Sequence, residues 1–187
     1  MQVKLFPLIF FALCYNCSMA QDAQSSATPN SDPDSQTSIE NRDSTENPFT
    51  EAFIALIESA DTMAAFHLEE WAVDTSDSSF YGYKTIAHQG LTLEQLDSFQ
   101  NLLLDESNYV IDQVAKRCEF GPNIGFYVGN DTEEAIILVA LNCDIIRIVY
   151  NGLEIVKEDI DPSHQAWVSL GNSIFPDAFT FYANTAN

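Results

Sequence analysis

The sequence predicts an α+β fold in which three helices cover one mainly antiparallel sheet of about five strands, including a C-terminal three-stranded meander. Three observations predict it. Apolar residues recur at helical spacing beside capping residues in three places, and an alternation of period two prevails in the C-terminal half. The elements follow in the order helix, two strands, helix, three strands, helix. With 46% hydrophobic residues, the chain of 187 residues can build one ordinary core.

The first 20 residues are typical of a signal peptide. Lys4 gives a positive start, residues 5–13 are apolar, and residues 18–20 (Ser-Met-Ala) form a small-x-small cleavage site. A lipoprotein signal needs a small residue directly before the modified cysteine, but Cys14 follows a leucine and Cys17 follows an asparagine. We therefore expect export in soluble form, to the periplasm or outside the cell, and a lipid anchor is the less favoured alternative.

Residues 21–48 predict a disordered acidic spacer. They include nine Ser or Thr, six Asp or Glu and three Pro, and Ile39 is their one large aliphatic residue. Such a segment cannot bury enough apolar surface to offset the entropy lost on ordering. It either holds the domain away from a surface or is an unselected tail. A single α+β domain then spans residues 49–187, with 22 acidic residues against 5 basic ones.

The first elements of this domain are a helix and two strands. Asn47 can cap a helix that has Pro48 at its first position, and apolar residues then fall on one face. These are Phe49, Phe53, Leu56, Ile57 and Ala60. Alternation over residues 62–71 predicts a strand, residues 74–79 a loop, and the aromatic-rich residues 80–87 a second strand.

The second helix has the clearest start in the chain. Thr92 and Gln95 can form a capping box, Leu91 can pack against Leu96, and the helical spacing continues to about Asp105. Residues 106–116 have no assignable pattern.

The meander follows from alternation that begins at Cys118 and from two turns. Asn130-Asp131 predicts a two-residue turn before the apolar run 135–141, and Asn151-Gly152 predicts a hairpin joining residues 147–150 to 153–156. The apolar parity changes between the run 135–141 and the residues near 147, which predicts a β-bulge or bend at residues 142–144.

A last helix is predicted to follow the meander. Asp161 can cap it and Pro162 can occupy its first position, while Trp167 and Leu170 lie on one side. Gly171 is the expected end of this helix.

Cys118 and Cys143 are predicted to form a structural disulfide. A two-residue turn at 130–131 pairs positions that sum to 261, so these cysteines lie directly opposite each other, in a non-hydrogen-bonded pair with Cα atoms about 4.5 Å apart. Their face also carries Phe120 and Ile124, so the bridge should be buried and inert. An oxidising compartment would preserve it. The alternative is a reactive redox pair, which needs an exposed thiol with a lowered pKa.

Five short strings spread over about residues 62–180 form a distinctive set. They are Tyr81-Gly82-Tyr83, the helix start Leu91-Thr92, Cys118-x-Phe120-x-Pro122, Leu141-x-Cys143 and the turn Asn151-Gly152. This set resembles a family of small exported bacterial proteins with no assigned activity, many of which look like lipoproteins. The resemblance implies a bacterial envelope or secreted location and supplies no catalytic residue.

Charge and motifs exclude several function classes. The formal net charge of −21 argues against nucleic acid or an anionic membrane surface as partner, because both need a basic patch. Beyond the predicted signal peptide, which contains Cys14 and Cys17, residues 21–187 have no C-x-x-C, no nucleophile elbow, no H-E-x-x-H and no phosphate-binding glycine loop. We therefore assign no catalytic residue, no cofactor and no metal.

Histidines and carboxylates are the groups left for chemistry. His67, His88 and His164 have no motif around them, and each is expected to be an ordinary histidine. Carboxylates cluster at Asp131, Glu133 and Glu134, and again at Glu158, Asp159 and Asp161. Calcium prefers such ligands, but neither cluster has the spacing of an EF-hand, and a solvated surface is the simpler interpretation.

Three function classes stay open. A non-catalytic binding or structural module of the envelope, with a basic envelope protein as its partner, is favoured by the acidity and the spacer. A hydrolase that uses His88 or His164 with carboxylates would need a deep pocket joining them. A thiol oxidoreductase would use Cys118 and Cys143.

Overall fold

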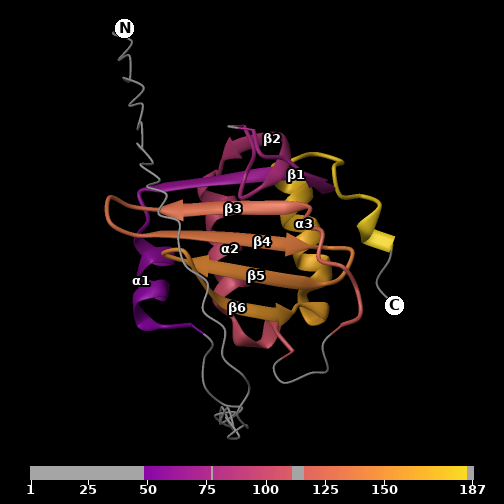
Figure 1. Ribbon diagram of the computed structural model, residues 1–187. Coiled ribbons are helices and arrows are strands. Elements are labelled where there is room, and N and C mark those ends of the chain that lie inside the picture. Colours follow the sequence, from indigo (N-terminus) through magenta and orange to yellow (C-terminus); the bar gives the residue numbers. More distant parts are fainter. Residues whose placement is uncertain (1–48, 77, 111–115, 185–187) are drawn as a thin grey trace, which may run out of the picture. The chain divides into compact units, whose positions relative to one another are not determined.

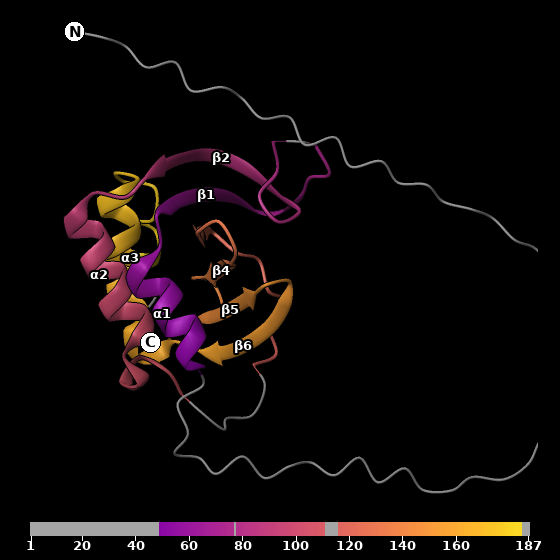
Figure 2. The ribbon, with the colours of Figure 1, turned by 90° about the vertical axis from the view of Figure 1, so that its left-hand side faces the viewer.

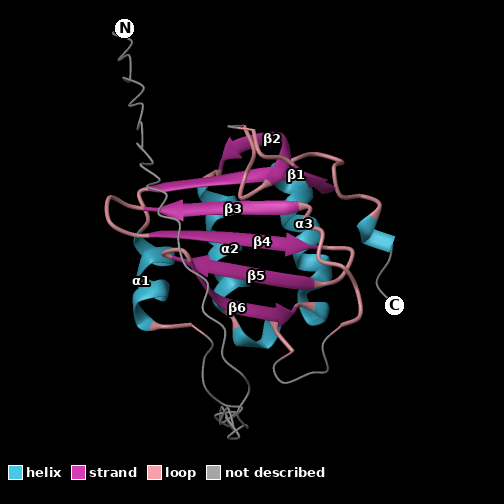
Figure 3. Ribbon diagram, in the orientation of Figure 1, coloured by secondary structure: helices cyan, strands magenta, loops and turns pink. Residues whose placement is uncertain are grey.

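Six antiparallel strands form one sheet, and three helices lie together on one of its faces, in the computed structural model of this protein (Figures 1 and 3). The structure describes residues 49–76, 78–110 and 116–184. The predicted signal peptide, residues 1–20, and the predicted spacer, residues 21–48, lie outside these ranges. The described residues all belong to one compact unit.

The strands lie in the order β2-β1-β3-β4-β5-β6. Their bounds are β1 Thr62–Val73, β2 Tyr83–Gly90, β3 Ile124–Gly129, β4 Glu134–Ala140, β5 Ile145–Tyr150 and β6 Leu153–Asp159. The helices are α1 Glu51–Ser59, α2 Leu93–Leu104 and α3 His164–Ile174, with short 3-10 helices at Glu106–Asn108, Asp161–Ser163 and Tyr182–Asn184. The predicted α+β class, with one antiparallel sheet and three helices, is confirmed.

The meander has four strands, β3 to β6, where the sequence predicted three. We expected a bulge or bend at residues 142–144 within one long strand. Instead the chain reverses there, and β4 pairs with β5 as a hairpin in which Ala140 faces Ile145. Asp144 takes a φ of 52° in this turn, which a short polar side chain tolerates well. The parity change at this point was the correct signal, but a tight turn produces it as readily as a bulge.

The helix boundaries show which capping signals decide. In α2, Thr92 accepts a hydrogen bond from the Gln95 amide and the Gln95 side chain accepts one from the Thr92 amide, which confirms the predicted capping box. The cap of α1 is Thr50, not the predicted Asn47, which lies outside the described residues. The predicted end of α3 at Gly171 is wrong, because the helix continues through it to Ile174. A Cβ at this glycine would overlap the ring of Phe179, so packing, not helix termination, requires it.

Two strands begin later than predicted. β2 starts at Tyr83 and not at Phe80, because Tyr81 and Gly82 both have positive φ, 49° and 82°, and form a tight turn. Phe80 and Tyr83 exchange two backbone hydrogen bonds across it. β3 starts at Ile124, so the alternation that begins at Cys118 does not extend the strand to that cysteine.

The main core lies between the sheet and the helices. Figure 2 shows the three helices together at the left of the view, with the strands to their right. Phe126 of β3 lies against Phe99 of α2, with ring centroids 4.5 Å apart, and both rings are fully buried together with Trp167 of α3. The directly opposed pairs Phe126–Ile137 and Val139–Ile146 place alternate strand residues on this face. The sheet therefore positions α2 and α3 as an outer layer whose other side faces solvent.

The opposite face of the sheet carries a smaller core without helices. Phe80 packs on Leu68 and Leu138, and stacks on Phe66 with ring centroids 3.9 Å apart. Gly125 lies under Phe80, and a Cβ at this position would overlap the ring. Loop segments, not secondary structure, thus cover this face.

Candidate functional site

Cys118 and Cys143, the predicted disulfide pair, are joined, but not in the predicted register. In β3 and β4 the positions of each pair sum to 263, as in Phe126–Ile137, so Cys118 is not directly opposite Cys143. The turn consists of residues 130–133, not the two residues 130–131, because the Asn130 side chain accepts hydrogen bonds from the Thr132 and Glu133 amides. The disulfide instead joins the segment before β3 to the β4–β5 turn, with Cα atoms 6.0 Å apart.

The disulfide is not fully buried as expected. Cys143 is 5% exposed, whereas Cys118 lies at an exposed position. Neither cysteine stands at a helix N-terminus, the position that would stabilise a thiolate in a redox enzyme. The bridge therefore fastens the segment that leads into β3 to the end of the sheet.

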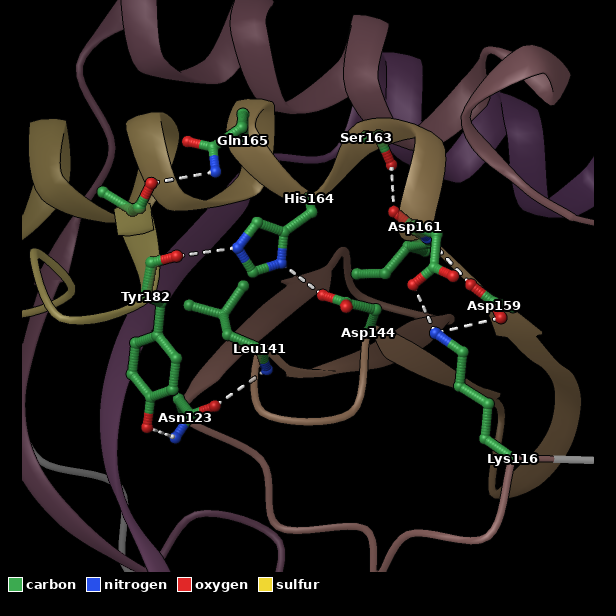
Figure 4. A network of polar contacts seen from close by, with 12 residues as sticks. Lys116, Asn123, Leu141, Asp144, Asp159, Asp161, Ser163, His164, Gln165 and Tyr182 are labelled. Atoms are coloured by element: carbon green, nitrogen blue, oxygen red, sulfur yellow. Dashed lines mark hydrogen bonds and ion pairs between the residues drawn. The ribbon is translucent and has the colours of Figure 1, made fainter. Parts of the chain in front are cut away.

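Of the three histidines considered from the sequence, the structure brings His164 together with a carboxylate, that of Asp144 (Figure 4). His164 opens α3, and Asp144 lies in the β4–β5 turn. The imidazole Nδ1 contacts the Asp144 carboxylate, and Nε2 lies 2.9 Å from the backbone carbonyl of Tyr182. The histidine is 5% exposed.

These partners make His164 a donor at both nitrogens. A carboxylate and a carbonyl only accept hydrogen bonds, so satisfying both requires the protonated imidazolium. Burial lowers the pKa of His164, but the hydrogen bonds to the Tyr182 carbonyl and to Asp144, with the negative charges of Asp144 and Asp161, outweigh it and raise the pKa overall. A protonated imidazole with both nitrogens engaged cannot accept a proton from a nucleophile. The pair fixes the C-terminal segment to the sheet.

A second polar chain supports the same segment. Buried Asn123 accepts a hydrogen bond from the Leu141 amide and donates to the Tyr182 hydroxyl, at 2.8 Å and 2.9 Å. The Tyr182 hydroxyl donates in turn to Glu70, at 2.9 Å. Burial, then Glu70, raises the pKa of Tyr182 to about 12, so the phenol stays neutral and donates. These contacts join β1, β4 and the C-terminal segment.

The two carboxylate clusters do not form metal sites. Lys116 lies between Asp159 and Asp161, and bonds both. At the β3–β4 turn, Glu133 accepts a hydrogen bond from Tyr150. Among the described residues, no group of three or more His, Cys, Asp or Glu side chains is arranged to hold a metal ion.

The other two histidines are far from an acid–base arrangement. His67 lies on the helix-covered face of β1, with Phe179 at 5.0 Å between ring centroids, and burial lowers its pKa. His88 is exposed on the edge strand β2, beside Phe66.

A groove between α2 and α3 is the feature that sequence reasoning missed. It encloses about 490 Å³ and is lined by Ser98, Asn101, Leu102, Asp105, Asn108, Ala166, Ser169, Leu170 and Ser173. On each helix the lining positions follow the spacing i, i+3, i+4 and i+7 of a single face, from Ser98 and from Ala166. Small residues at that spacing were the available signal, but nothing in the sequence placed the two faces together.

In the described part of the molecule, acidic residues lie on both layers, but basic residues lie only on the sheet side. The five Lys and Arg residues of this part, at 84, 116, 117, 147 and 157, lie on strands or on the segment before β3. The helices and the 3-10 turn after α2 carry Glu51, Glu58, Glu94, Asp97, Asp105 and Glu106 and no Lys or Arg. Their outer surface is therefore of a single charge sign.

Comparison with known proteins gives no relative for this chain, and its described helices do not have the character of membrane spans. No family model, curated protein or solved structure matches the chain. In the described ranges, every helix is too short or too polar to traverse a lipid bilayer.

Proposed function

We propose that this protein is an exported, non-catalytic binding module of the bacterial envelope, and that its acidic helical layer binds a basic protein partner. The observation that carries this proposal is that the described helical layer carries carboxylates but no Lys or Arg. The six carboxylates of the helical layer have no Lys or Arg among them, whereas most of the basic residues on the sheet side are paired. Arg147, for example, bonds Glu154, and Lys84 lies 2.5 Å from Glu69.

A surface of one sign favours a partner of the opposite sign. It raises the rate of encounter and disfavours partners of like charge, and both effects weaken as salt screens the charges. The periplasm or the cell exterior, reached through the predicted signal peptide of residues 1–20, is the proposed location. The acidic spacer of residues 21–48 would then let the domain reach a partner at a distance from a surface.

Two catalytic alternatives have less support. A hydrolase built on His164 would need a free ring nitrogen facing a substrate, and both nitrogens are engaged. A thiol oxidoreductase built on Cys118 and Cys143 would need an activated thiolate, and neither cysteine begins a helix.

The test is a cross-linked pull-down from bacterial envelopes at low and at high salt. The full chain should capture a basic protein at low salt and lose it at high salt. A variant with Glu58→Gln and Asp97→Asn, two exposed residues of the helical layer, should capture less. A matched control with Glu119→Gln and Asp131→Asn, two exposed carboxylates outside that layer, should capture as much as the parent.

The outcomes separate the parts of the proposal. Equal loss in both variants would mean that total charge, not the helical layer, is recognised. Capture of no envelope protein at low salt would remove the main support for a binding function.

A further inference from the structure

The groove between α2 and α3 is held open by its own polar contacts. Gln95 at the start of α2 donates to the Ser173 carbonyl near the end of α3, at 2.7 Å. Ser163, before α3, donates to the Asn108 carbonyl beyond the end of α2, at 2.9 Å. The two helices are therefore antiparallel and joined at both ends, so the hollow between them is preformed.

The walls of this groove are less polar than their sequence suggests. The hydroxyls of Ser98, Ser169 and Ser173 donate to carbonyls of their own helices, at 2.9, 2.7 and 2.7 Å. The single O–H donor of each serine is thus used, and these residues contribute mainly small side-chain bulk to the walls. Leu102 and Leu170, which are 9% and 5% exposed, lie among them. The groove can accept apolar side chains with little polar surface left unpaired.

One end of the groove is negative. Asp105 lines it at the C-terminus of α2, where the helix dipole adds negative potential. The hydroxyl and then the amide of Ser107 donate to its carboxylate and hold the pKa of Asp105 below its ordinary value. The charge therefore persists over the physiological range, and no Lys or Arg of the helices opposes it.

We infer that this groove is the docking site for a basic amphipathic helix of the partner, whose apolar face enters the groove while a Lys or Arg lies beside Asp105. This inference rests on the proposed function and specifies its site. Recognition of a helix in a groove uses anchors of the bound helix at the spacing i, i+3, i+4 and i+7, and an elongated groove between two antiparallel helices can accept such a row. The charge of the helical layer disfavours the other candidates, a second copy of this chain and its own acidic residues 21–48.

A synthetic peptide tests the site directly. The probe is a fluorescent Lys/Leu peptide roughly 14 residues long, about four helical turns, with leucines on one face. A scrambled peptide of the same composition is the control for charge alone. Fluorescence anisotropy with the full chain should show binding of the amphipathic peptide at low salt and weaker binding of the scrambled one.

Two pairs of matched variants locate the binding. Ala166→Trp fills the groove from an exposed position of α3, and Ala52→Trp places the same ring at an exposed position of α1. Asp105→Asn removes the charge and keeps the acceptor for Ser107. Asp74→Asn is its control, because Asp74 accepts the same two hydrogen bonds from Ser76 in the loop after β1. Should Ala166→Trp fail to fold, Ser169→Phe fills the same groove.

We expect Ala166→Trp to weaken peptide binding by about tenfold or more, Asp105→Asn by roughly threefold, and the two controls by less than twofold. Equal binding of the scrambled peptide, or equal loss in a control and its partner variant, would overturn the groove as the site. A peptide that binds the groove variants normally, with capture of an envelope protein intact, would overturn this inference alone. Failure of both the peptide and the pull-down would overturn the proposed function as well.

Discussion

The two faces of the sheet are covered in different ways. On one face, three helices pack a continuous core in which Phe99, Phe126 and Trp167 are fully buried. On the other, the buried cluster consists of Leu68, Phe80 and Leu138, and the chain that covers it has no helix. Packing among many side chains stabilises the first face, whereas a few individual contacts stabilise the second.

The contacts on the second face involve the segment before β3. The ring of Trp71 lies against Gly121, and the Arg147 guanidinium lies 5.2 Å from the centre of the Phe120 ring. The Cys118–Cys143 disulfide anchors the same segment. We therefore expect a substitution on the helix-covered face to lower stability through lost packing of many side chains. A substitution on the other face should lower stability only by the contribution of the one contact that it removes.

The largest expected effect comes from Phe99 on the helix-covered face. Phe99→Ala should lower the free energy of unfolding by about 3–5 kcal/mol, because it removes a fully buried ring that other core residues surround. Phe80→Ala on the other face should cost less, near the lower end of that range, because a loop can close on the space. Urea unfolding of the two variants measures both. An equal or larger cost at Phe80 would break the comparison.

The disulfide should have the next largest effect. Its sequence separation is 25, and closing a loop of that size stabilises a protein by about 3 kcal/mol. A reductant should therefore lower the unfolding free energy of the parent but not that of the double variant Cys118→Ser, Cys143→Ser.

Thiol titration gives the independent check on this bond. Without reductant, the parent and the double variant should show the same number of reactive thiols. Two additional thiols in the parent would show that the bond does not form.

Local signals in the sequence predicted the elements well and their partners less well. The α2 capping box involves residues three apart, and Asn151 and Gly152, with φ of 47° and 79°, form the predicted tight turn. At the β3–β4 turn the same kind of reasoning failed, because Asn130 caps a four-residue turn through its side chain. The register moved by two positions, which preserves the facing of every side chain but changes the pairing of every residue.

Local sequence patterns could not predict the candidate sites, because these sites join residues that are distant in the sequence. His164 and Asp144 are 20 residues apart, and Ser163 meets Asn108 over 55 residues, so no periodic pattern connects them. The groove depends on which faces α2 and α3 present to each other after both pack on the sheet. Long-range packing decides that, and a single sequence reveals only the small residues at helical spacing.

The contribution of His164 to stability should depend on pH. Its pKa is raised in the folded protein, so the stability that it contributes is fully present below the ordinary value of 6.5 and is lost as the pH rises through the higher folded value. Above that value one ring nitrogen becomes an acceptor facing an acceptor. Hydrogen bonds to charged groups contribute on the order of 1.5–3 kcal/mol, so a loss of about 2 kcal/mol is expected.

The measurement compares the parent with His164→Gln in urea unfolding across pH. The stability difference between them should be largest just below pH 6.5 and should shrink above it. Burial raises the pKa of Asp144, so the difference should also fall at acidic pH, where this carboxylate is protonated. A difference that stays flat or grows above this pH would show that His164 is neutral in the folded protein. Over the same range, the protection of the Tyr182 amide against hydrogen exchange, relative to the intrinsic rate at each pH, should decrease.

The smallest expected effect is a gain, at the turn that leads into β2. Tyr81 and Asn151 hold equivalent positions in two tight turns, each before a glycine, with φ of 49° and 47°. A bulky side chain is disfavoured at such φ values, whereas asparagine is the preferred residue there. Tyr81 is 50% exposed, so little packing opposes its replacement.

Tyr81→Asn should therefore stabilise the protein by about 1 kcal/mol, the cost of a left-handed residue with a bulky side chain. The reciprocal change, Asn151→Tyr, should destabilise it by more, because the Asn151 side chain also accepts a hydrogen bond from the Glu134 amide at 3.0 Å. Thermal unfolding of both variants decides the matter. A destabilised Tyr81→Asn would mean that the Tyr81 ring contributes more to covering this face than its exposure indicates.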